Sequence, residues 1–380
     1  MTSPVAVTSL AALQQAVSDA YRARTPLRIS AGRHWLDAGR TVHASAELHV
    51  GGVSGVVEYS PGDFTLAALT GTTLAELDAV THEHGQWVTL DPFGSRHGTL
   101  GATLATASAG PLAATVGAPR DVTLGVTFVN GEGQVIHGGG RVVKNVAGFD
   151  LVRLTIGAWG SLGVIGEATI RVRARPQVDR TIRLELPTSA ADWASLFLAI
   201  RQAPATPLAV QVVNAPLGAR LGLGAAHCVL IRLAGNRASV TAQQDALHGI
   251  ARIEEVPDTI WNLLTASDPQ HARSLRLSAE PTALARSWQD LDHRFGGDDV
   301  SMSACVLRGV TRLVASPTRD EHLSEWIRQR PQHLTAVGER LPSQLWALLP
   351  APTNALSVGI RRALDPAGIL NPGILGIGPA

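Results

Sequence analysis

Three segments rich in glycine and other small residues lie in the first half of this 380-residue chain, and they constrain its fold more than any other feature. They run from Ser30 to Trp35, from Gly98 to Gly110 and from Gly160 to Gly166. Small side chains let backbone N–H groups approach a phosphate or a flat ring, and successive amides form an anion-binding concavity. One such segment alone is more often a site of close packing. Three in one domain favour a large cofactor that contains a pyrophosphate.

Motifs that would indicate other chemistry are absent. The sequence has no GxSxG, GxxxxGK[ST], HExxH or GxGxxG pattern. Cys228 and Cys305 form no CxxC pair, so we expect no iron–sulfur cluster and no metal site in this chain. His82 and His84 stand two apart on an expected helix, which is a poor spacing for metal ligands. The net charge is +1 and no element is rich in Lys or Arg, which argues against a nucleic-acid partner.

Hydropathy and the N-terminal sequence predict a cytoplasmic location, or a peripheral one at the membrane through partner chains. No run of 18 or more apolar residues is present, so we expect no transmembrane segment. The first ten residues, MTSPVAVTSL, have no basic region before an apolar run, which argues against a signal peptide.

The first 176 residues alternate short strands with helices, as in an α/β or α+β domain. Thr73 and Glu76 have the spacing of a capping box, and Asn130-Gly131 between two apolar runs indicates a hairpin. The expected helices span 8–24 and 73–85, and the expected strands span 27–30, 56–59, 64–69, 122–129, 134–137 and 164–172.

After Pro176 the pattern changes to β-α-β-β-α-β, which is typical of a ferredoxin-like domain. The segments are 181–186, 190–202, 207–213, 226–234, 236–249 and 252–256. We therefore predict an N-terminal domain over 1–176, a ferredoxin-like domain over 177–340 and a C-terminal tail over 341–380. The tail contains ALDPAGILNPG at 363–373, whose Pro and Gly content predicts turns.

Residues 55–176 resemble a known family. The matching stretches are GVVEYSPGDFTLAALTGTTLAEL, HGQWVTLDP, GTLGATLATASAGP, GAPRDVTLGVTFVNGEGQVIHGGGRVVKNVAGFDLVRL and GSLGVIGEATIRV. In this order and spacing they resemble the PCMH-type FAD-binding domain of the vanillyl-alcohol-oxidase superfamily, and within it the FAD-binding subunits of glycolate oxidases. Arg276-Leu277-Ser278 and the tail DPAGILNPG are similar to those subunits too.

The resemblance implies an α+β fold: a PCMH-type FAD-binding domain of two α/β subdomains, with a ferredoxin-like cap and a tail that returns to the flavin. It also implies FAD as cofactor. Lys144, the only lysine among 32 basic residues, lies in the distinctive stretch VVKNVAGFD. For Lys144, Asn145, Gly148 and Asp150 a turn around a buried polar group is the alternative interpretation.

The resemblance assigns cofactor contacts segment by segment. The first pyrophosphate loop corresponds to Ser30, Ala31, Gly32, Arg33 and His34, and the second FAD segment to Thr99, Leu100, Gly101, Ala102, Ala109 and Gly110. The neighbour of the isoalloxazine corresponds to Gly117, and the segment at the adenine end to Gly163, Val164 and Ile165. The tail residue that returns to the flavin corresponds to Asn371, and Lys144 is a further candidate.

The chain departs from the family pattern at the first loop. The family usually has three glycines followed by Ser or Thr, whereas this chain has Ala31, Gly32, Arg33 and His34. Arg33 adds bulk where close backbone approach is expected. His34 stands where some relatives attach FAD covalently to histidine, and an ordinary loop histidine is the alternative. No cysteine precedes Cys228, which excludes attachment through a second, cysteine bond.

The resemblance implies a flavin-dependent oxidoreductase that oxidises a small 2-hydroxy acid as one subunit of a complex. A second FAD subunit and an iron–sulfur subunit are the expected partners. Arg276 is a candidate for binding the substrate carboxylate, because a guanidinium suits that group, and a surface salt bridge is the alternative. Asn371 is the other catalytic candidate. The chain could instead be a non-catalytic subunit that holds FAD, or a scaffold that has lost it.

Overall fold

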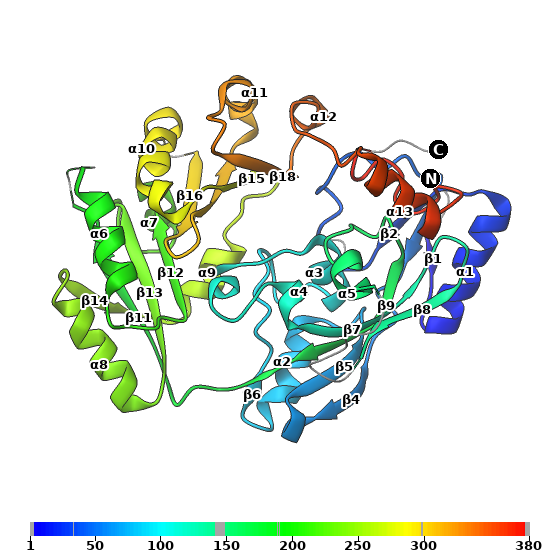
Figure 1. The fold of residues 1–380 in the computed structure, drawn as a ribbon, viewed down its shortest axis with the longest axis horizontal. Coiled ribbons are helices and arrows are strands. Elements are labelled where there is room, and N and C mark those ends of the chain that lie inside the picture. The colour runs from blue at the N-terminus through cyan, green and yellow to red at the C-terminus, as the bar shows by residue number, and fades with distance from the viewer. Residues whose placement is uncertain are drawn as a thin grey trace. The chain divides into compact units, whose positions relative to one another are not determined.

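The computed structural model describes residues 4–32, 34–140, 149–187, 189, 191–297 and 299–376. They divide into two compact units (Figure 1). Unit 1 comprises Met1–Ala113, Gly117–Arg175 and Pro350–Ala380, and unit 2 comprises Ala114–Val116 and Pro176–Leu349. The chain therefore leaves unit 1, builds unit 2 and returns to unit 1.

Unit 1 begins with a three-stranded parallel sheet of order β1-β3-β2. Its strands are β1 (Val5–Ala6), β2 (Leu27–Ser30) and β3 (Ala46–His49). Helix α1 (Leu10–Ala23) starts at Ser9, whose side chain accepts a hydrogen bond from the Ala12 N–H at 3.1 Å. Its residues Leu13, Val17 and Ala20 follow the helical period and are buried in the core around this sheet.

A five-stranded antiparallel sheet forms the rest of the framework of unit 1, in the order β4-β5-β9-β7-β8. The apolar side chains of Leu66, Phe128 and Ile170, one on each of three of its strands, are fully buried in the core of unit 1. The strands of this sheet are β4 (Val56–Ser60), β5 (Thr65–Leu69), β7 (Thr123–Val129), β8 (Val135–Gly139) and β9 (Val164–Arg171), and a separate pair is formed by β6 (Gln86–Trp87) and β10 (Arg173–Ala174).

The predicted capping box is confirmed. The Thr73 hydroxyl accepts from the Glu76 N–H, and the Glu76 carboxylate accepts from the Thr73 N–H at 2.8 Å. The predicted hairpin also forms, with a five-residue connection from 130 to 134. The helices of unit 1 after α1 are α2 (Leu74–His82), α3 (Leu100–Thr106), α4 (Pro119–Val122), α5 (Leu151–Thr155) and α13 (Ala355–Leu364), and short 3-10 turns span η1 (Pro61–Asp63) and η2 (Pro111–Ala114).

The second small-residue segment is largely a helix, which was not among the helices expected from the sequence. Thr99 caps α3, and Leu100 and Leu104, four residues apart, are fully buried in the core of the five-stranded sheet. The helix ends at Ala107, which adopts a left-handed φ of 51°. The helix was missed because glycine and alanine dominate this segment, and two leucines four residues apart are its only strong sign of helical periodicity.

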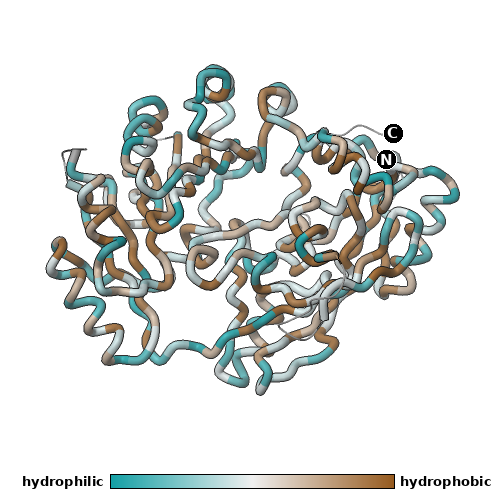
Figure 2. The backbone as a smooth tube through the Cα atoms, viewed as in Figure 1, coloured by the Kyte–Doolittle hydropathy of each residue, from teal (hydrophilic) through white to brown (hydrophobic). Residues whose placement is uncertain are grey.

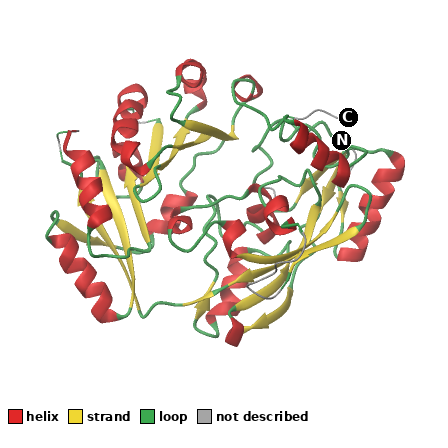
Figure 3. Ribbon diagram, viewed as in Figure 1, coloured by secondary structure: helices red, strands yellow, loops and turns green. Residues whose placement is uncertain are grey.

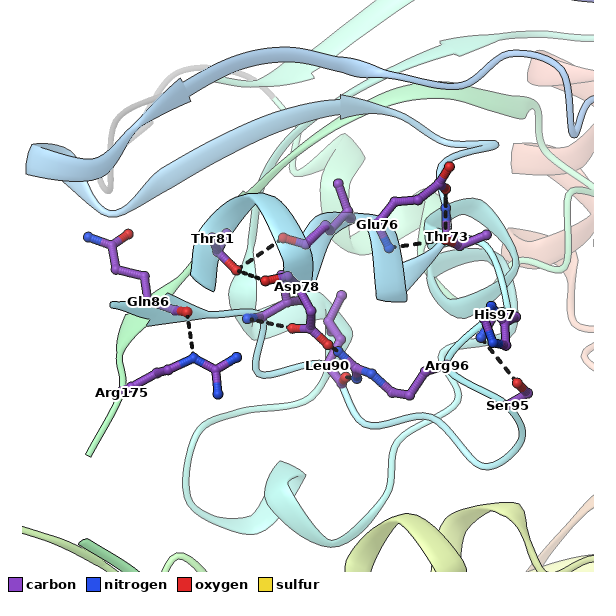
Figure 4. A network of polar contacts seen from close by, with 12 residues as sticks. Thr73, Glu76, Asp78, Thr81, Gln86, Leu90, Ser95, Arg96, His97 and Arg175 are labelled. Atoms are coloured by element: carbon purple, nitrogen blue, oxygen red, sulfur yellow. Dashed lines mark hydrogen bonds and ion pairs between the residues drawn. The ribbon is translucent and has the colours of Figure 1, made fainter. Parts of the chain in front are cut away.

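A polar network fixes the approach to this helix (Figure 4). The Arg96 guanidinium donates to the Asp78 carboxylate and to the Leu90 carbonyl, and Asp78 also accepts from the Val88 N–H at 3.3 Å. The His97 N–H donates to the Ser95 hydroxyl at 3.1 Å. Residues 88–98 are thereby tied to α2 before the chain enters α3.

Unit 2 is built on one eight-stranded antiparallel sheet of order β14-β11-β13-β12-β16-β17-β15-β18. The predicted β-α-β-β-α-β pattern is confirmed in its first half. In Figure 2, apolar stretches run along β12 and β13, whose inward side chains are buried. This first module consists of β11 (Val178–Glu185), α6 (Ala191–Gln202), β12 (Ala209–Val213), β13 (Cys228–Gly235), α8 (Arg237–His248) and β14 (Ile253–Val256).

The other half of the sheet is a second module with the same β-α-β-β-α-β order, which was not predicted (Figure 3). It joins the first by pairing β12 with β16, and one apolar core extends under both halves. The second module consists of β15 (Arg273–Ser278), α10 (Leu284–Phe295), β16 (Val300–Cys305), β17 (Val310–Ala315), α11 (Asp320–Gln329) and β18 (Thr335–Arg340).

Short helices complete unit 2: α7 (Ala215–Arg220), α9 (Ile260–Ala266), α12 (Ser343–Trp346), η3 (Pro281–Ala283) and η4 (Pro317–Arg319). Within the described ranges, no helix combines the length and the apolar character that crossing a bilayer would take.

Candidate cofactor site

A pocket in unit 1 gathers the ends of several segments that are far apart in the sequence. It encloses about 900 Å³ of empty space, open solvent at its mouth included. We call it the unit 1 pocket. The predicted cofactor residues that line it are Ser30, Ala31, Gly32, His34, Thr99, Gly101, Ala102, Gly163, Val164, Ile165 and Asn371.

The first predicted loop follows β2 directly. The Ser30 hydroxyl donates to the buried Glu47 carboxylate at 2.5 Å and lies 3.2 Å from His49 Nδ1. The N–H groups of Ala31 and Gly32 make no hydrogen bond to another described residue. Two adjacent amides at the edge of the pocket are thus available to an anion.

The N-terminal amides of α3 are already used inside the protein. The N–H of Leu100 donates to the Thr72 carbonyl, and that of Gly101 donates to the Thr70 carbonyl, both at 2.8 Å. A Cβ added at Gly101 would lie 2.9 Å from the Thr70 Cβ. Glycine is therefore needed at 101 for close packing, while Leu100 lies in the core and does not line the pocket.

Ala109, Gly110 and Gly117 do not line the unit 1 pocket. The Gly110 N–H donates to the Asp91 carboxylate at 3.2 Å, and an added Cβ would collide with the Asp91 carbonyl. Gly117 has a left-handed φ of 103° in the turn before α4. Glycine is therefore required at both positions by the local structure, at 110 by close packing and at 117 by the backbone conformation.

The start of β9 forms another wall of the pocket. Gly163 packs against the Phe128 ring, so a larger residue has no room there. The Ile165 carbonyl accepts a hydrogen bond from the Thr70 hydroxyl at 2.5 Å. Thr70 and Ile165 thus join β5 to β9 at the pocket.

Asn371 lines the pocket, and its side chain is committed to the fold. Its Oδ1 accepts from the Ile29 N–H, and its Nδ2 donates to the Trp159 carbonyl, both at 2.8 Å. The residue is 7% exposed and has a left-handed φ of 44°. Asn371 therefore fastens the tail to β2 and to the loop before β9.

Residues that the sequence analysis missed complete the lining. Aromatic and aliphatic side chains dominate this set. Two of these residues, Trp35 and Trp159, could have been found from the sequence, because each is a tryptophan next to a glycine-rich segment. The additional lining residues are Arg28, Ile29, Trp35, Leu36, Ala38, Val42, Val50, Thr70, Ala105, Thr106, Trp159, Gly160 and Ile374.

Three other candidates lie elsewhere. Arg33 and Lys144 fall outside the described residues. Arg276 belongs to β15 of unit 2, where it pairs with Arg312 of β17 across the sheet.

The unit 1 pocket suits a nucleotide with a pyrophosphate. Among the described residues that line it, only Arg28 and His34 are ionisable, so none of them brings a carboxylate that would oppose an anion. Free amides at Ala31 and Gly32 can bind phosphate oxygens, and the apolar and tryptophan walls can enclose flat rings. In the part of the chain that the structure describes, no cluster of three His, Cys, Asp or Glu side chains could hold a metal ion.

Comparisons with known proteins agree with this geometry. Residues 4–139 match the family described as FAD binding domain. The chain is 29% identical over 364 residues to glycolate oxidase subunit GlcE of Escherichia coli, covering 95% of this chain and 96% of that protein. It is 28% identical to glycolate oxidase subunit GlcD of Bacillus subtilis, over 40% of this chain and 33% of that protein.

The fold is also found among solved structures. A structure of p-cresol methylhydroxylase with substrate bound aligns with a TM-score of 0.75 at 15% identity, covering 99% of this chain and 88% of the other. An alkyldihydroxyacetonephosphate synthase aligns with a TM-score of 0.73 at 16% identity, covering 97% and 75%. The expected resemblance and the mixed helix-and-sheet fold are confirmed.

Proposed function

We propose that this chain binds FAD in the unit 1 pocket and acts as the FAD-binding subunit of a glycolate-oxidase-like complex that oxidises a 2-hydroxy acid. One observation carries the proposal: the pocket brings together the loop after β2, the start of α3, the start of β9 and Asn371. Similarity to GlcE along almost the whole of both chains supports the functional class.

Each segment has a distinct part in holding the cofactor. The Ala31 and Gly32 amides bind the pyrophosphate, while the α3 amides keep the framework rigid. Gly163, Val164 and Ile165 form a wall against the cofactor, and the tail closes the pocket through Asn371. When bound, the flavin supplies the hydride acceptor, and the protein contributes binding, orientation and exclusion of water.

Arg276 of unit 2 is our candidate for binding the substrate carboxylate. Its neighbour Arg312 is compensated by two carboxylates, those of Asp268 at 2.6 Å and Glu339 at 3.1 Å. Arg276 forms no ion pair with a described residue. On the same side of β15, the buried Ser274 hydroxyl has no hydrogen-bond partner among the described residues. An uncompensated guanidinium beside an unsatisfied hydroxyl suits a small carboxylate.

The partners that we propose are a second FAD subunit and an iron–sulfur subunit. The match to GlcE spans almost the whole of both chains, whereas the match to GlcD covers only 33% of that protein. We therefore propose that this chain corresponds to the GlcE-like subunit and that a separate GlcD-like subunit is its partner. We place the complex in the cytoplasm or at the membrane surface through its partners. The second candidate function, a non-catalytic subunit that holds FAD for its partners, is favoured by the commitment of Asn371 to structure.

FAD binding is tested on the purified full chain. We expect yellow protein with flavin absorption, or an apoprotein that takes up added FAD with a rise in melting temperature. Colourless protein that gives no signal on titration with FAD would refute the proposal.

Catalysis is tested by dye reduction with glycolate and D-lactate, for the chain alone and after addition of partner subunits. We expect little activity alone and activity in the complex. Arg276→Met should raise KM more than tenfold, because one charge-assisted contact contributes about 1.5–3 kcal/mol. Arg237→Met, an exposed arginine at the start of α8, is the control. Equal KM values for both variants would remove Arg276 from the site and favour the non-catalytic subunit.

A further inference from the structure

Trp159 has an unusual backbone at the edge of the unit 1 pocket. Its φ is 55°, in the left-handed region that bulky side chains rarely adopt. Surrounding contacts hold it there: its N–H donates to the Ala105 carbonyl at 2.8 Å, and its carbonyl accepts from Asn371 Nδ2 at 2.8 Å. A strained conformation that neighbours enforce is a sign of function.

The requirement for a large side chain at this position is not explained by the backbone. The next residue, Gly160, is also left-handed, with φ 68°, and it is a glycine as the conformation favours. A glycine at 159 would keep both backbone hydrogen bonds without strain. Tryptophan at 159 must therefore be explained by what its ring does.

The Trp159 ring is positioned in the wall of the pocket. Gly39 packs beside it, since a Cβ added there would lie 3.2 Å from Cζ3 of Trp159. The Trp35 ring is 6.2 Å away, centroid to centroid, at an interplanar angle of 83°. Both tryptophans line the same pocket. Two perpendicular rings cannot stack on one flat ligand ring, so one offers its face and the other its edge.

We propose that Trp159 is a stacking platform for a flat heteroaromatic ring of the bound dinucleotide, with Trp35 contacting that ring at its edge. The inference rests on the proposed function, because it requires FAD in the unit 1 pocket. We assign the face to Trp159 because its backbone is fixed at both its N–H and its carbonyl. Both adenine and isoalloxazine have the required chemistry, and the experiment separates them.

The test uses the full chain prepared without bound nucleotide, titrated with FAD, ADP and FMN by calorimetry. The variants are Trp159→Phe, Trp159→Leu and Trp35→Leu, with Trp87→Leu on β6 as a control outside the pocket. Trp159→Leu should weaken FAD binding about tenfold, whereas Trp159→Phe should retain most of the affinity. The same loss for ADP but not FMN identifies adenine as the stacked ring, and the reverse identifies isoalloxazine.

Fluorescence of bound FAD gives a second readout, because an adjacent indole quenches an excited isoalloxazine by electron transfer. If isoalloxazine is the stacked ring, Trp159→Leu brightens bound flavin severalfold and Trp87→Leu does not. Melting of the apoproteins checks that each variant folds. Unchanged affinity in a folded Trp159→Leu protein would overturn the inference while leaving FAD binding intact, as would a larger loss in Trp35→Leu. Failure of the wild-type chain to bind FAD would instead refute the proposed function.

Discussion

Glycine at position 101 illustrates how one residue type can serve two purposes. The sequence predicts that the backbone approaches a cofactor at Gly101 and Gly163. Both line the unit 1 pocket, yet each also faces a protein group that leaves no room for a side chain, the Thr70 carbonyl for Gly101 and the Phe128 ring for Gly163. A sequence reveals that a position must be small, whereas only the three-dimensional neighbours reveal why.

Replacing Gly101 with alanine should therefore destabilise the protein with and without FAD. The added Cβ meets the Thr70 Cβ at 2.9 Å and its carbonyl oxygen at 3.0 Å. Overpacking of this kind costs about 1–3 kcal/mol, which exceeds the roughly 1 kcal/mol that alanine normally contributes in a helix. Thermal melting of apo and FAD-loaded protein should show equal falls. Gly62→Ala, where nothing lies within 4 Å of the added Cβ, is the control. A fall confined to the FAD-loaded form would contradict the packing explanation.

At the scale of elements, prediction succeeded where patterns are local. Capping at Thr73 and the first module of unit 2 follow from short-range periodicity. The second module has such a pattern too: in β15, Leu275 and Leu277 are buried and alternate with polar residues. The unit 1 pocket could not be predicted this way, because it depends on pairings such as Leu27 with Leu370, whose separation no local pattern encodes.

The polar side of the second module predicts a pH dependence of stability. Burial alone would raise the pKa of Asp268, but the guanidiniums of Arg312, Arg340 and Arg220 outweigh it and hold that pKa below its ordinary value. A lowered pKa in the folded state contributes stability that is present above the unfolded pKa of about 3.9 and is lost as pH falls through the folded pKa.

Asp268→Asn should accordingly lower stability by about 3–5 kcal/mol at pH 7, since it leaves buried Arg312 with one carboxylate fewer. The difference in stability between this variant and the wild type should become smaller when thermal melting is measured below pH 4. Asp258→Asn, an exposed aspartate before α9, is the control. A stability difference that stays constant from pH 7 to pH 3 would show that Asp268 has the same pKa in the folded and unfolded states, which would contradict the lowered pKa.

At the scale of the whole molecule, the two units differ in how the chain builds them. Unit 2 is almost continuous, from Pro176 to Leu349, and contains its own core in which Trp288, Phe197 and Phe295 are buried. Unit 1 needs three separate stretches, the last beginning at Pro350. A continuous segment with its own core satisfies the usual conditions for independent folding.

Residues 176–349 expressed alone should therefore form a cooperatively melting, β-rich protein that does not bind FAD. Circular dichroism and FAD titration check both statements. An excised segment that melts without cooperativity would show that unit 2 depends on unit 1 for its stability.

The tail has a consequence for biosynthesis. Asn371 and Ile374 line the unit 1 pocket, and the Leu27 N–H donates to the Ile369 carbonyl at 2.7 Å. Translation runs from the N-terminus, and domains generally fold in the order in which they leave the ribosome. Unit 2 can then fold while the first stretches of unit 1 still wait for their final segment. If FAD binds in this pocket, as we propose, we expect its capture to be postponed until residue 374 has emerged, so that a nascent or prematurely terminated polypeptide does not sequester FAD.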